Sequence, residues 1–323
     1  MTGPRRIWTI GEALAALVSP DTRALEHVNH LNVGMGGAEF NVAIGVARLG
    51  HAAAWIGVVG DDPWGRQVRR ELRAEGVDVR ARVTGESFTA AYVRERRAGT
   101  CTRATYLRRG SAGSMLCESD LALLEPRPGD VVHLTGITPA LSQSAREAWS
   151  GAVDKAKSSG ALVSVDVNFR SKLWAAMQAR KAFADIARHV DLLLASPEEA
   201  SLVFGLESTE PQTCAKVLQG LLAPGAQVVM KLGAAGSMHF DPDGLATHGA
   251  ALQVPVVDPV GAGDAFAAGF LSGALDGLSV SERLVRAHAC AAYVVASSGD
   301  WEGLPRPEEM TSAHLLANEE LQR

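Results

Sequence analysis

Residues 258–264 read Asp258-Pro-Val-Gly-Ala-Gly-Asp264, and the chain continues Ala-Phe-Ala-Ala-Gly-Phe-Leu. The apolar residues before this stretch predict a strand ending near Val257, and those after it predict a helix beginning near Asp264. Gly261 and Gly263 permit a tight turn and a close approach of other groups to the backbone. The free amides and the dipole of a helix start attract a phosphate or a developing negative charge. The stretch therefore predicts an α/β connection with an anion site at its turn.

Asp264 is an unusual residue for a site that only binds anions, because a carboxylate repels them. Its position is explained if it takes a proton from an attacking hydroxyl while the amides of the turn stabilise a transferring phosphoryl group. The alternative is that Asp264 is only a helix cap, which is a common role for Asp at this position. Both interpretations follow from the stretch taken alone.

Other phosphate-binding motifs do not match. The sequence contains no Gly-Lys-Ser/Thr of a Walker A loop, and it lacks the His-Arg-Asp and Asp-Phe-Gly of protein kinases. A dinucleotide-binding fingerprint would need a glycine where Phe266 stands, and the stretch lies near the wrong end of the chain.

Short apolar runs alternate with segments of helical periodicity through most of the remaining sequence. Such alternation predicts βαβ units and a mostly parallel sheet covered on both faces. The expected strands are Ala52–Val59, Val131–Leu134, Ala161–Val167, Leu192–Ala195 and Val228–Leu232, and the expected helices include Trp64–Glu75 and Ala140–Lys157.

Two regions depart from the alternation and predict a small β lid over a site. Residues 12–35 have weak periodicity, and residues 87–109 hold the strand-like runs Thr89–Arg97 and Thr102–Arg109, joined near residues 98–100. The polar tail from Arg306 is expected to end in a surface helix. We expect residues 1–323 to form a single domain, with lid segments at about 12–35 and 87–109.

The composition excludes several classes of protein. The 323 residues carry a net charge of −5, which argues against a nucleic-acid partner. A Glu interrupts each basic run, at residues 69–73 and 94–97, so both are expected on solvated surfaces. The four cysteines form no close pair, which indicates neither a zinc site nor a disulfide framework, and no apolar run of about 18 residues predicts a membrane span. We expect a cytoplasmic protein with no membrane partner.

A second glycine cluster lies near the N-terminus, where residues 34–41 read Gly34-Met-Gly-Gly-Ala-Glu-Phe-Asn41. With the stretch at residues 258–264, it resembles the two signatures of the ribokinase-like (PfkB-type) carbohydrate kinases. The N-terminal signature is matched by Gly36, Gly37, Asn41, Ala43, Gly50 and Gly60. The resemblance spans nearly the whole chain. It implies a three-layer α/β ribokinase-like fold with a central mostly parallel sheet, a β lid over the sugar, and ATP bound with Mg²⁺. It leaves a requirement for a monovalent cation open.

The resemblance also implies roles for particular residues. Asp264 would be the catalytic base, and Gly261, Ala262 and Gly263 would form the anion hole. Asp61 would lie near the lid side of the substrate pocket. The residues implied on the nucleotide side are Asn168, Ser196, Lys231, Gly233, Gly236, Gly261, Gly263 and His288.

Two positions depart from the pattern of the family. Many relatives carry Asn-x-x-Glu where this chain has Ser196-Pro-Glu-Glu199. Glu199 would still orient a metal-bound water, whereas Ser196 would face the nucleotide. His288 stands where some relatives have an Asn near the adenine, and a surface or packing histidine is the alternative.

The run from Val163 to Arg170 bears on the substrate. Asp166, Asn168 and Arg170 alternate, so on a continuous strand they would face one side, at the sheet end where α/β folds bind ligands. An arginine there can pair with a carboxylate, which a neutral sugar would not need. The alternative is that Arg170 contacts an ATP phosphate or solvent.

Further segments narrow the resemblance to the 2-keto-3-deoxygluconate kinases. They are residues 106–114, 134–141, 166–170 and 299–303. In that subfamily the equivalents of Gly37, Tyr92, Tyr106, Arg108, Arg170, Asp264 and Asp300 line the sugar-acid site. Asp300 is alternatively a turn residue.

The implied activity is ATP-dependent phosphorylation of the terminal hydroxyl of 2-keto-3-deoxygluconate, giving 2-keto-3-deoxy-6-phosphogluconate. The alternatives are a kinase for another sugar or sugar acid, such as fructose, and a non-catalytic sugar-binding sensor. The exposed hairpin of the lid offers an edge through which a homo-oligomer is expected.

Overall fold

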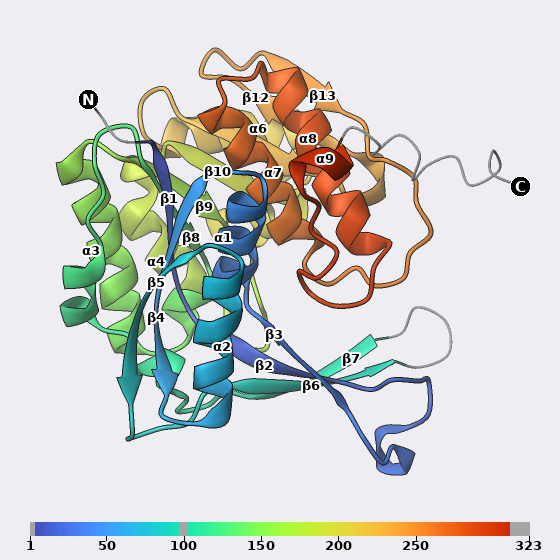
Figure 1. Cartoon of the computed structure of the whole chain (residues 1–323). Helices are drawn as coiled ribbons and strands as arrows, with labels where there is room; N and C mark the ends of the chain where they lie inside the picture. The colour runs from blue at the N-terminus through green and yellow to red at the C-terminus, as the bar shows by residue number, and fades with distance from the viewer. Residues whose placement is uncertain (1–3, 97–101, 311–323) are drawn as a thin grey trace, which may run out of the picture.

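A nine-stranded sheet forms the centre of the molecule in the computed structural model, which describes residues 4–96 and 102–310 (Figure 1). Its strand order is β13-β12-β11-β10-β9-β8-β1-β4-β5. The strands are β1 (Arg6–Ile10), β4 (Ala52–Gly60), β5 (Asp78–Thr84), β8 (Val131–Thr135), β9 (Leu162–Asp166), β10 (Leu192–Ala195), β11 (Gln227–Lys231), β12 (Ser237–Phe240) and β13 (Ala246–Gly249).

The sheet is mostly parallel, as the sequence predicts. Every pairing from β5 to β11 is parallel, and only β12 and β13 add antiparallel pairs at one edge. The expectation of a strand ending near Val257 is wrong, because residues 250–257 contain no strand.

Side chains that alternate along the strands produce the two outer layers. On β1, Trp8 and Ile10 belong to one apolar core, while Ile7 belongs to a second core on the opposite face. On β11, Met230 and Val229 divide in the same way. Both faces are therefore apolar and both are covered by helices, which gives the three-layer α/β architecture.

The helices divide between the two faces. The first core includes side chains of α3 (Gln143–Ser159), α4 (Ala176–Ile186), α5 (Pro197–Phe204) and α6 (Pro211–Leu221). The second core includes side chains of α1 (Ala38–Arg48), α2 (Pro63–Ala74), α7 (Ala262–Leu275) and α8 (Val280–Val295). Short 3₁₀ turns are η1 (Leu25–His27), η2 (Ala112–Met115), η3 (Glu118–Leu123), η4 (Thr138–Ala140), η5 (Ala187–His189) and η6 (Gly233–Ala235).

A second sheet of four strands projects from the end of the molecule toward which β4 and β5 point (Figure 1). Its order is β3 (Asn32–Gly36), β2 (Leu14–Val18), β6 (Ala91–Arg96) and β7 (Thr102–Leu107). We call these four strands the lid. They come from the two segments in which the sequence departs from its α/β alternation, and a parallel β2–β6 pair joins the segments.

The chain ends, within the described residues, at α9 (Pro307–Met310). The rest of the polar tail, for which a surface helix is expected, lies outside the described residues, as does the connection between β6 and β7. In the described part of the chain, no helix is both long and apolar enough to cross a membrane.

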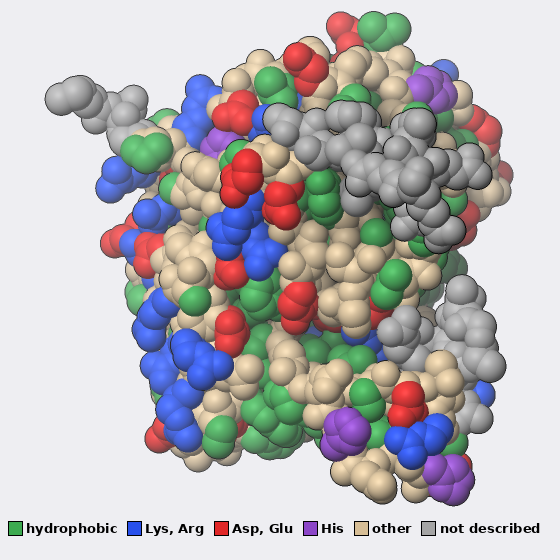
Figure 2. All heavy atoms as spheres, turned by 45° about the vertical axis from the view of Figure 1, so that its right-hand side comes forward, with side chains coloured by type: hydrophobic (Ala, Val, Ile, Leu, Met, Phe, Trp, Pro, Cys, Tyr) green, Lys and Arg blue, Asp and Glu red, His purple; other side chains and the backbone are tan. Residues whose placement is uncertain are grey.

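Exposed apolar side chains gather around the lid. Figure 2 shows one face of the molecule, with hydrophobic side chains over its lower part and mixed acidic and basic side chains over much of the remainder. Several of the large exposed hydrophobic residues belong to the lid or its flanks: Val33, Phe88, Tyr106 and Leu107.

Candidate active site

The glycine-rich turn that precedes α7 has a conformation that requires its first glycine. Gly261 is the N-cap residue of α7 with φ +80°, and a Cβ there would lie 1.9 Å from the backbone oxygen of Asp300. No side chain caps the helix, and although the amide of Ala262 donates to the backbone oxygen of Pro259 at 3.4 Å, the following amides of the first turn remain available for an anion. Asp264 lies within the first turn and not at the N-cap, so the helix-cap interpretation is wrong.

Asp264 lies between two carboxamides. The Nδ2 atom of Asn41 donates a 2.8 Å hydrogen bond to Oδ2 of Asp264, and Nδ2 of Asn168 lies 3.5 Å from Oδ1. Burial raises the pKa of Asp264 to about 7, and the hydrogen bond from Asn41 opposes that rise. A carboxyl group with such a pKa can both accept and release a proton near neutrality.

The segment after β9 differs from the expected strand. β9 ends at Asp166, and Asn168 has φ +38°, in the left-handed region that non-glycine residues seldom adopt. Asp166, Asn168 and Arg170 therefore do not alternate on one strand. Asp166 instead accepts hydrogen bonds of 2.6 and 2.7 Å from Nζ of Lys231, while Asn168 faces Asp264.

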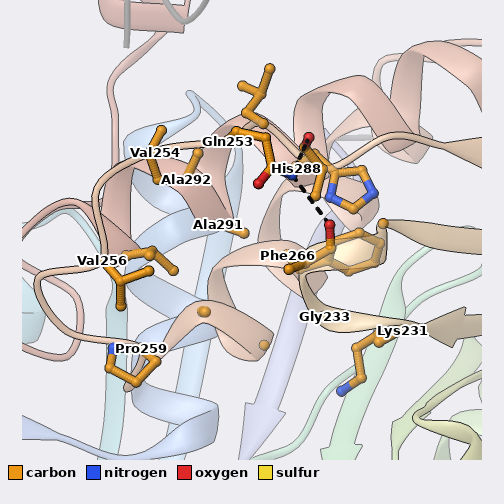
Figure 3. Close-up of a pocket in the computed structure, with 17 residues that line it drawn as sticks. Lys231, Gly233, Gln253, Val254, Val256, Pro259, Phe266, His288, Ala291 and Ala292 are labelled. Carbon is orange, nitrogen blue, oxygen red and sulfur yellow. Dashed lines mark hydrogen bonds between the residues drawn. The ribbon is translucent and has the colours of Figure 1, made fainter. Parts of the chain in front are cut away.

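A cavity of about 330 Å³ lies on one side of the turn (Figure 3). Its wall is largely apolar, with Val254, Val256, Phe266 and Ala292 among the labelled residues. Other residues that line it include Lys231, Gly233, Gly236, Ala262, Gly263 and His288. A flat apolar group that carries phosphates toward Lys231 and the turn would suit this cavity.

His288 is a buried part of this wall and not a surface residue. Its Nε2 atom lies 2.8 Å from Oγ of Ser237, and its ring meets Phe266 edge to face at 5.1 Å. Burial lowers the pKa of His288, which favours the neutral form of the ring.

Ser196 and Glu199 form a capping box at the start of α5 and do not line the cavity. The Ser196 hydroxyl accepts from the Glu199 amide, and Oε2 of Glu199 accepts from the Ser196 amide at 2.9 Å. The other oxygen, Oε1, accepts from the amide of Phe169 at 2.9 Å. The structure thus gives both residues a local structural role. The family resemblance implies that Ser196 faces the nucleotide, but Ser196 is not part of the lining of this cavity.

The donor set restricts how a divalent metal ion can bind. Within residues 4–96 and 102–310, no group of three or more His, Cys, Asp or Glu side chains is arranged to hold a metal ion. Asp166 forms an ion pair with Lys231. Burial opposes the positive charge of Lys231, but the negative charges of Asp166 and Glu199 outweigh burial and raise the pKa of Lys231. These residues fit a Mg²⁺ ion only if phosphate oxygens and water supply most of its ligands, with Glu199 acting through water.

A second cavity, of about 270 Å³, lies on the other side of the turn beneath the lid. Asp264 and Gly261 line it, so the turn separates the two cavities and faces both. The structure brings all of the sequence-predicted substrate residues together here: Gly37, Tyr92, Tyr106, Arg108, Arg170 and Asp300. We call this space the lid cavity.

The two predicted arginines of the lid cavity differ in their partners. Nε of Arg108 donates to Oε2 of Glu12 at 2.8 Å, and the carboxylate of Glu12 is fully buried and also accepts from Ser111. Arg170 is exposed, and its guanidinium has no hydrogen-bond or ion-pair partner in the described part of the chain. Arg170 is therefore the cation that remains open to a ligand, and Glu12 is a neighbour that the sequence did not indicate.

Arg94 contradicts the expectation for its basic run. The sequence predicts a solvated position, but Arg94 is 1% exposed on β6 and lines the lid cavity. Its guanidinium forms ion pairs of 2.8 Å with Asp258 and 3.2 Å with Asp300. The hydroxyl of Tyr92 donates to the same Asp300 oxygen at 2.6 Å. Asp300 is therefore a member of a buried network and not simply a turn residue.

The family resemblance implies that Asp61 lies near the substrate pocket, and the structure shows that this is wrong. Its side chain is 69% exposed, pairs at 3.6 Å with Arg66, and is not part of the lid cavity. The neighbouring Asp62 is instead the residue with a structural role, because it caps α2 and accepts from the amides of Gly65 and Thr89.

A groove of about 880 Å³ continues outward from the lid cavity, with which it shares Tyr106, Arg108 and Arg170. Arg109 and Lys172 also line it, and among the described residues of its lining there is no acidic side chain. The entrance to the lid cavity is thus positively charged, although the chain as a whole is negative.

A carboxyl group of near-neutral pKa, an anion-binding helix start and two cavities that meet at them define a phosphotransferase of the α/β class. The chain belongs to the pfkB family of carbohydrate kinases, because the model of this family ("pfkB family carbohydrate kinase") matches residues 4–307.

Relatives in the family are named for different activities. The chain is 32% identical over 308 residues to a 2-dehydro-3-deoxygluconokinase of Bacillus subtilis (strain 168), which covers 94% of each chain. It is 33% identical to a 2-dehydro-3-deoxygalactonokinase of Haloferax volcanii, over 90% of this chain and 91% of the relative. It is also 32% identical to a fructokinase of Escherichia coli, over 95% and 98%.

Solved structures share the fold. A 2-dehydro-3-deoxygluconokinase from Thermotoga maritima superposes with a TM-score of 0.85 at 26% identity, covering 98% of each chain. A double mutant of a fructokinase from Vibrio cholerae O395, described in a form with bound fructose, ADP and potassium ion, has a TM-score of 0.83 at 26% identity, covering 95% of this chain and 97% of its own.

The described residues around the turn do not fit a monovalent metal ion. The buried carboxylates that flank the turn, Asp258 and Asp300, already contact the guanidinium of Arg94. Lys231 neutralises Asp166 on the other side of the turn. Each of these carboxylates thus already contacts a cationic side chain, and none of them is free to hold such an ion.

Proposed function

We propose that the protein phosphorylates the terminal hydroxyl of 2-keto-3-deoxygluconate, also called 2-dehydro-3-deoxygluconate, with ATP, giving 2-keto-3-deoxy-6-phosphogluconate. The observation that carries the proposal is the unpartnered guanidinium of Arg170 in the cavity that also holds Asp264. A neutral sugar gives such a cation no charged partner, whereas a sugar acid supplies a carboxylate for bidentate pairing.

In this proposal each cavity holds one substrate. The base and ribose of ATP occupy the cavity beside His288 and Phe266, and the phosphates lie between Lys231 and the turn. The sugar acid occupies the lid cavity, with its carboxylate at Arg170 and its terminal hydroxyl at Asp264. When bound, Mg²⁺ would neutralise charge on the phosphates.

Asp264 takes the proton of the terminal hydroxyl as the sugar oxygen forms its bond to the γ-phosphorus. The bond from that phosphorus to the oxygen of the leaving ADP breaks in the same displacement. The amides of Gly261, Ala262 and Gly263, together with Lys231, stabilise the negative charge on the transferring group.

The proposal is tested by coupled detection of ADP with Mg-ATP and a panel of acceptors. We expect 2-keto-3-deoxygluconate to have a kcat/KM far above those of fructose and ribose, with its galactonate epimer included as a close competitor. Because one relative is a fructokinase, fructose is the principal alternative. Equal or better turnover of a neutral sugar would reject the assignment of a sugar acid.

The carboxylate contact is tested by Arg170→Met and Arg108→Met. A lost charge-assisted contact should raise the KM for the acid roughly 10- to 100-fold in Arg170→Met, with the melting temperature unchanged. Arg108→Met should lower the melting temperature because it leaves the buried Glu12 without its ion pair. Arg103→Met, at an exposed lid position outside the cavity linings, is the matched control. An unchanged KM in Arg170→Met contradicts the placement of the carboxylate.

A further inference from the structure

Two buried carboxylates hold the anion-binding turn in place from either side. Asp258 stands at its beginning, and its Oδ1 atom accepts a 3.1 Å hydrogen bond from the amide of Val260. Asp300 lies across from it, and its backbone oxygen occupies the space where Gly261 has no side chain. The shape of the turn therefore depends on the positions of both residues.

One cation, supplied by the lid, contacts both carboxylates. The Nη2 atom of Arg94 lies 2.8 Å from Oδ2 of Asp258, and its Nη1 atom lies 3.2 Å from Oδ1 of Asp300. Burial raises the pKa of Asp300 to about 6, while the charge of Arg94 and the hydroxyl of Tyr92 oppose that rise. Glu302, whose carboxylate accepts from the amide of Asp300, adds negative charge on the far side.

We propose that Arg94 is a positioning residue that acts as the built-in cation of the anion-binding turn, so that phosphoryl transfer needs no monovalent metal ion. Its planar fork reaches both carboxylates at once and fixes their separation, and thereby the turn between them. Because Arg94 belongs to β6, the same contacts join the lid to the turn. This inference rests on the phosphotransfer activity of the family and not on the identity of the sugar.

The chemistry of the vacated site provides a direct test. Truncation of Arg94 to Ala leaves a space bordered by carboxylate oxygens of Asp258 and Asp300 and by the hydroxyl of Tyr92. A set of oxygen donors with uncompensated negative charge attracts small hard cations, and the space also has the shape of a guanidinium ion. Added K⁺ or guanidinium should therefore replace the missing side chain.

The experiment measures kcat and KM with Mg-ATP and the best acceptor of the panel, in buffers whose monovalent cation is tetramethylammonium, Na⁺ or K⁺. The unaltered protein should have the same kcat in all three. Arg94→Ala should lose at least about tenfold in kcat in tetramethylammonium and regain part of it, saturably, with millimolar K⁺ or guanidinium. Arg103→Ala, on the neighbouring strand of the lid, should respond to none of these changes.

A second readout separates positioning from stability alone. Without Arg94 the pKa of Asp300 should rise above about 6, so a second ionisation should add to the acidic limb that Asp264 sets and should disappear again when guanidinium is added. Arg94→Ser also removes the charge and leaves the space open, and is expected to show the same cation response if the Ala variant does not fold.

Three results would overturn the inference. One is a dependence of the unaltered protein on K⁺. Another is full activity of Arg94→Ala in tetramethylammonium. The third is a loss of activity in both variants that neither K⁺ nor guanidinium changes. A failure of the sugar-acid assignment would instead appear in the acceptor panel and would leave the cation response intact.

Discussion

Asp264 is the residue whose ionisation should govern the rate. Its pKa of about 7 in the folded protein means that the carboxylate form required of a base dominates only above that pH. We expect kcat/KM to rise with pH through about 7 and then to level off. Asp264→Asn should lower kcat by roughly 10²–10⁴, the usual share of general-base catalysis, and should abolish this pH dependence.

A stability measurement serves as the control for this prediction. The folded pKa of Asp264 is raised above its ordinary value of 3.8, so the folded state holds the proton more tightly than the unfolded state. Its contribution to stability is present below pH 4 and is lost as the pH rises through about 7. Asp264→Asn should therefore gain melting temperature relative to the unaltered protein at pH 8 and not at pH 4. An unchanged kcat in this variant would reject Asp264 as the base.

Residues of local motifs could be predicted from the sequence, and residues of distant partnerships could not. Gly261 and Asp264 belong to one turn, and the spacing of the turn indicates their chemistry. Arg94 is separated by 164 residues from Asp258, and Glu12 by 96 residues from Arg108. Nothing in the basic run around Arg94 distinguishes a buried ion pair from a solvated surface.

Among the elements, the turn before α7 offers the sharpest test of geometry. Gly261→Ala places a Cβ against the backbone oxygen of Asp300 and strains a left-handed φ of +80°. Gly277 also has a left-handed φ, of +72°, but a Cβ there would meet nothing within 4 Å. Both substitutions should lose about 1 kcal/mol of stability from the backbone conformation.

Only Gly261→Ala should also displace the turn, and we expect its kcat to fall at least about tenfold while Gly277→Ala keeps its kcat. Melting temperature and steady-state kinetics of the two variants separate the two effects. Equal kinetics in both would show that the close approach of Asp300 to the turn is unimportant for transfer.

Elements with a strict pattern could be predicted, and an apolar run that lines a cavity could not. Residues 52–59 alternate between the two cores and form β4 as expected. Residues before Asp258 are equally apolar, yet Val254 and Val256 form the wall of the cavity beside His288, and Val256 is 58% exposed. A ligand surface and a strand interior have the same composition, which is why the expected strand is absent.

At the scale of the whole molecule, the lid presents two edge strands. β3 and β7 flank the four-stranded sheet, and Val33 and Leu107 on these strands are each 50% exposed. Unpaired edges with apolar side chains favour association with another strand. We propose a homo-oligomer formed through the lid, as the sequence leads us to expect.

Size-exclusion chromatography with light scattering should therefore detect at least a dimer, and Val33→Glu should shift it toward the monomer. Leu245→Glu is the control, because Leu245 is also exposed, at 69%, but lies in the turn between β12 and β13. A monomer at all concentrations, or equal effects of the two substitutions, would exclude association through the lid.

The contact between Arg94 and Asp258 has a consequence for evolution and for engineering. It ties β6 to a loop that the chain reaches only 164 residues later. If the lid of this protein were replaced by the lid of a relative with an uncharged residue at the position of Arg94, Asp258 would lose its positively charged partner. Any recombination breakpoint between the two residues inherits the same mismatch. The part of the chain that encloses the sugar is therefore not an interchangeable module, and its history is bound to that of the turn where phosphate is transferred.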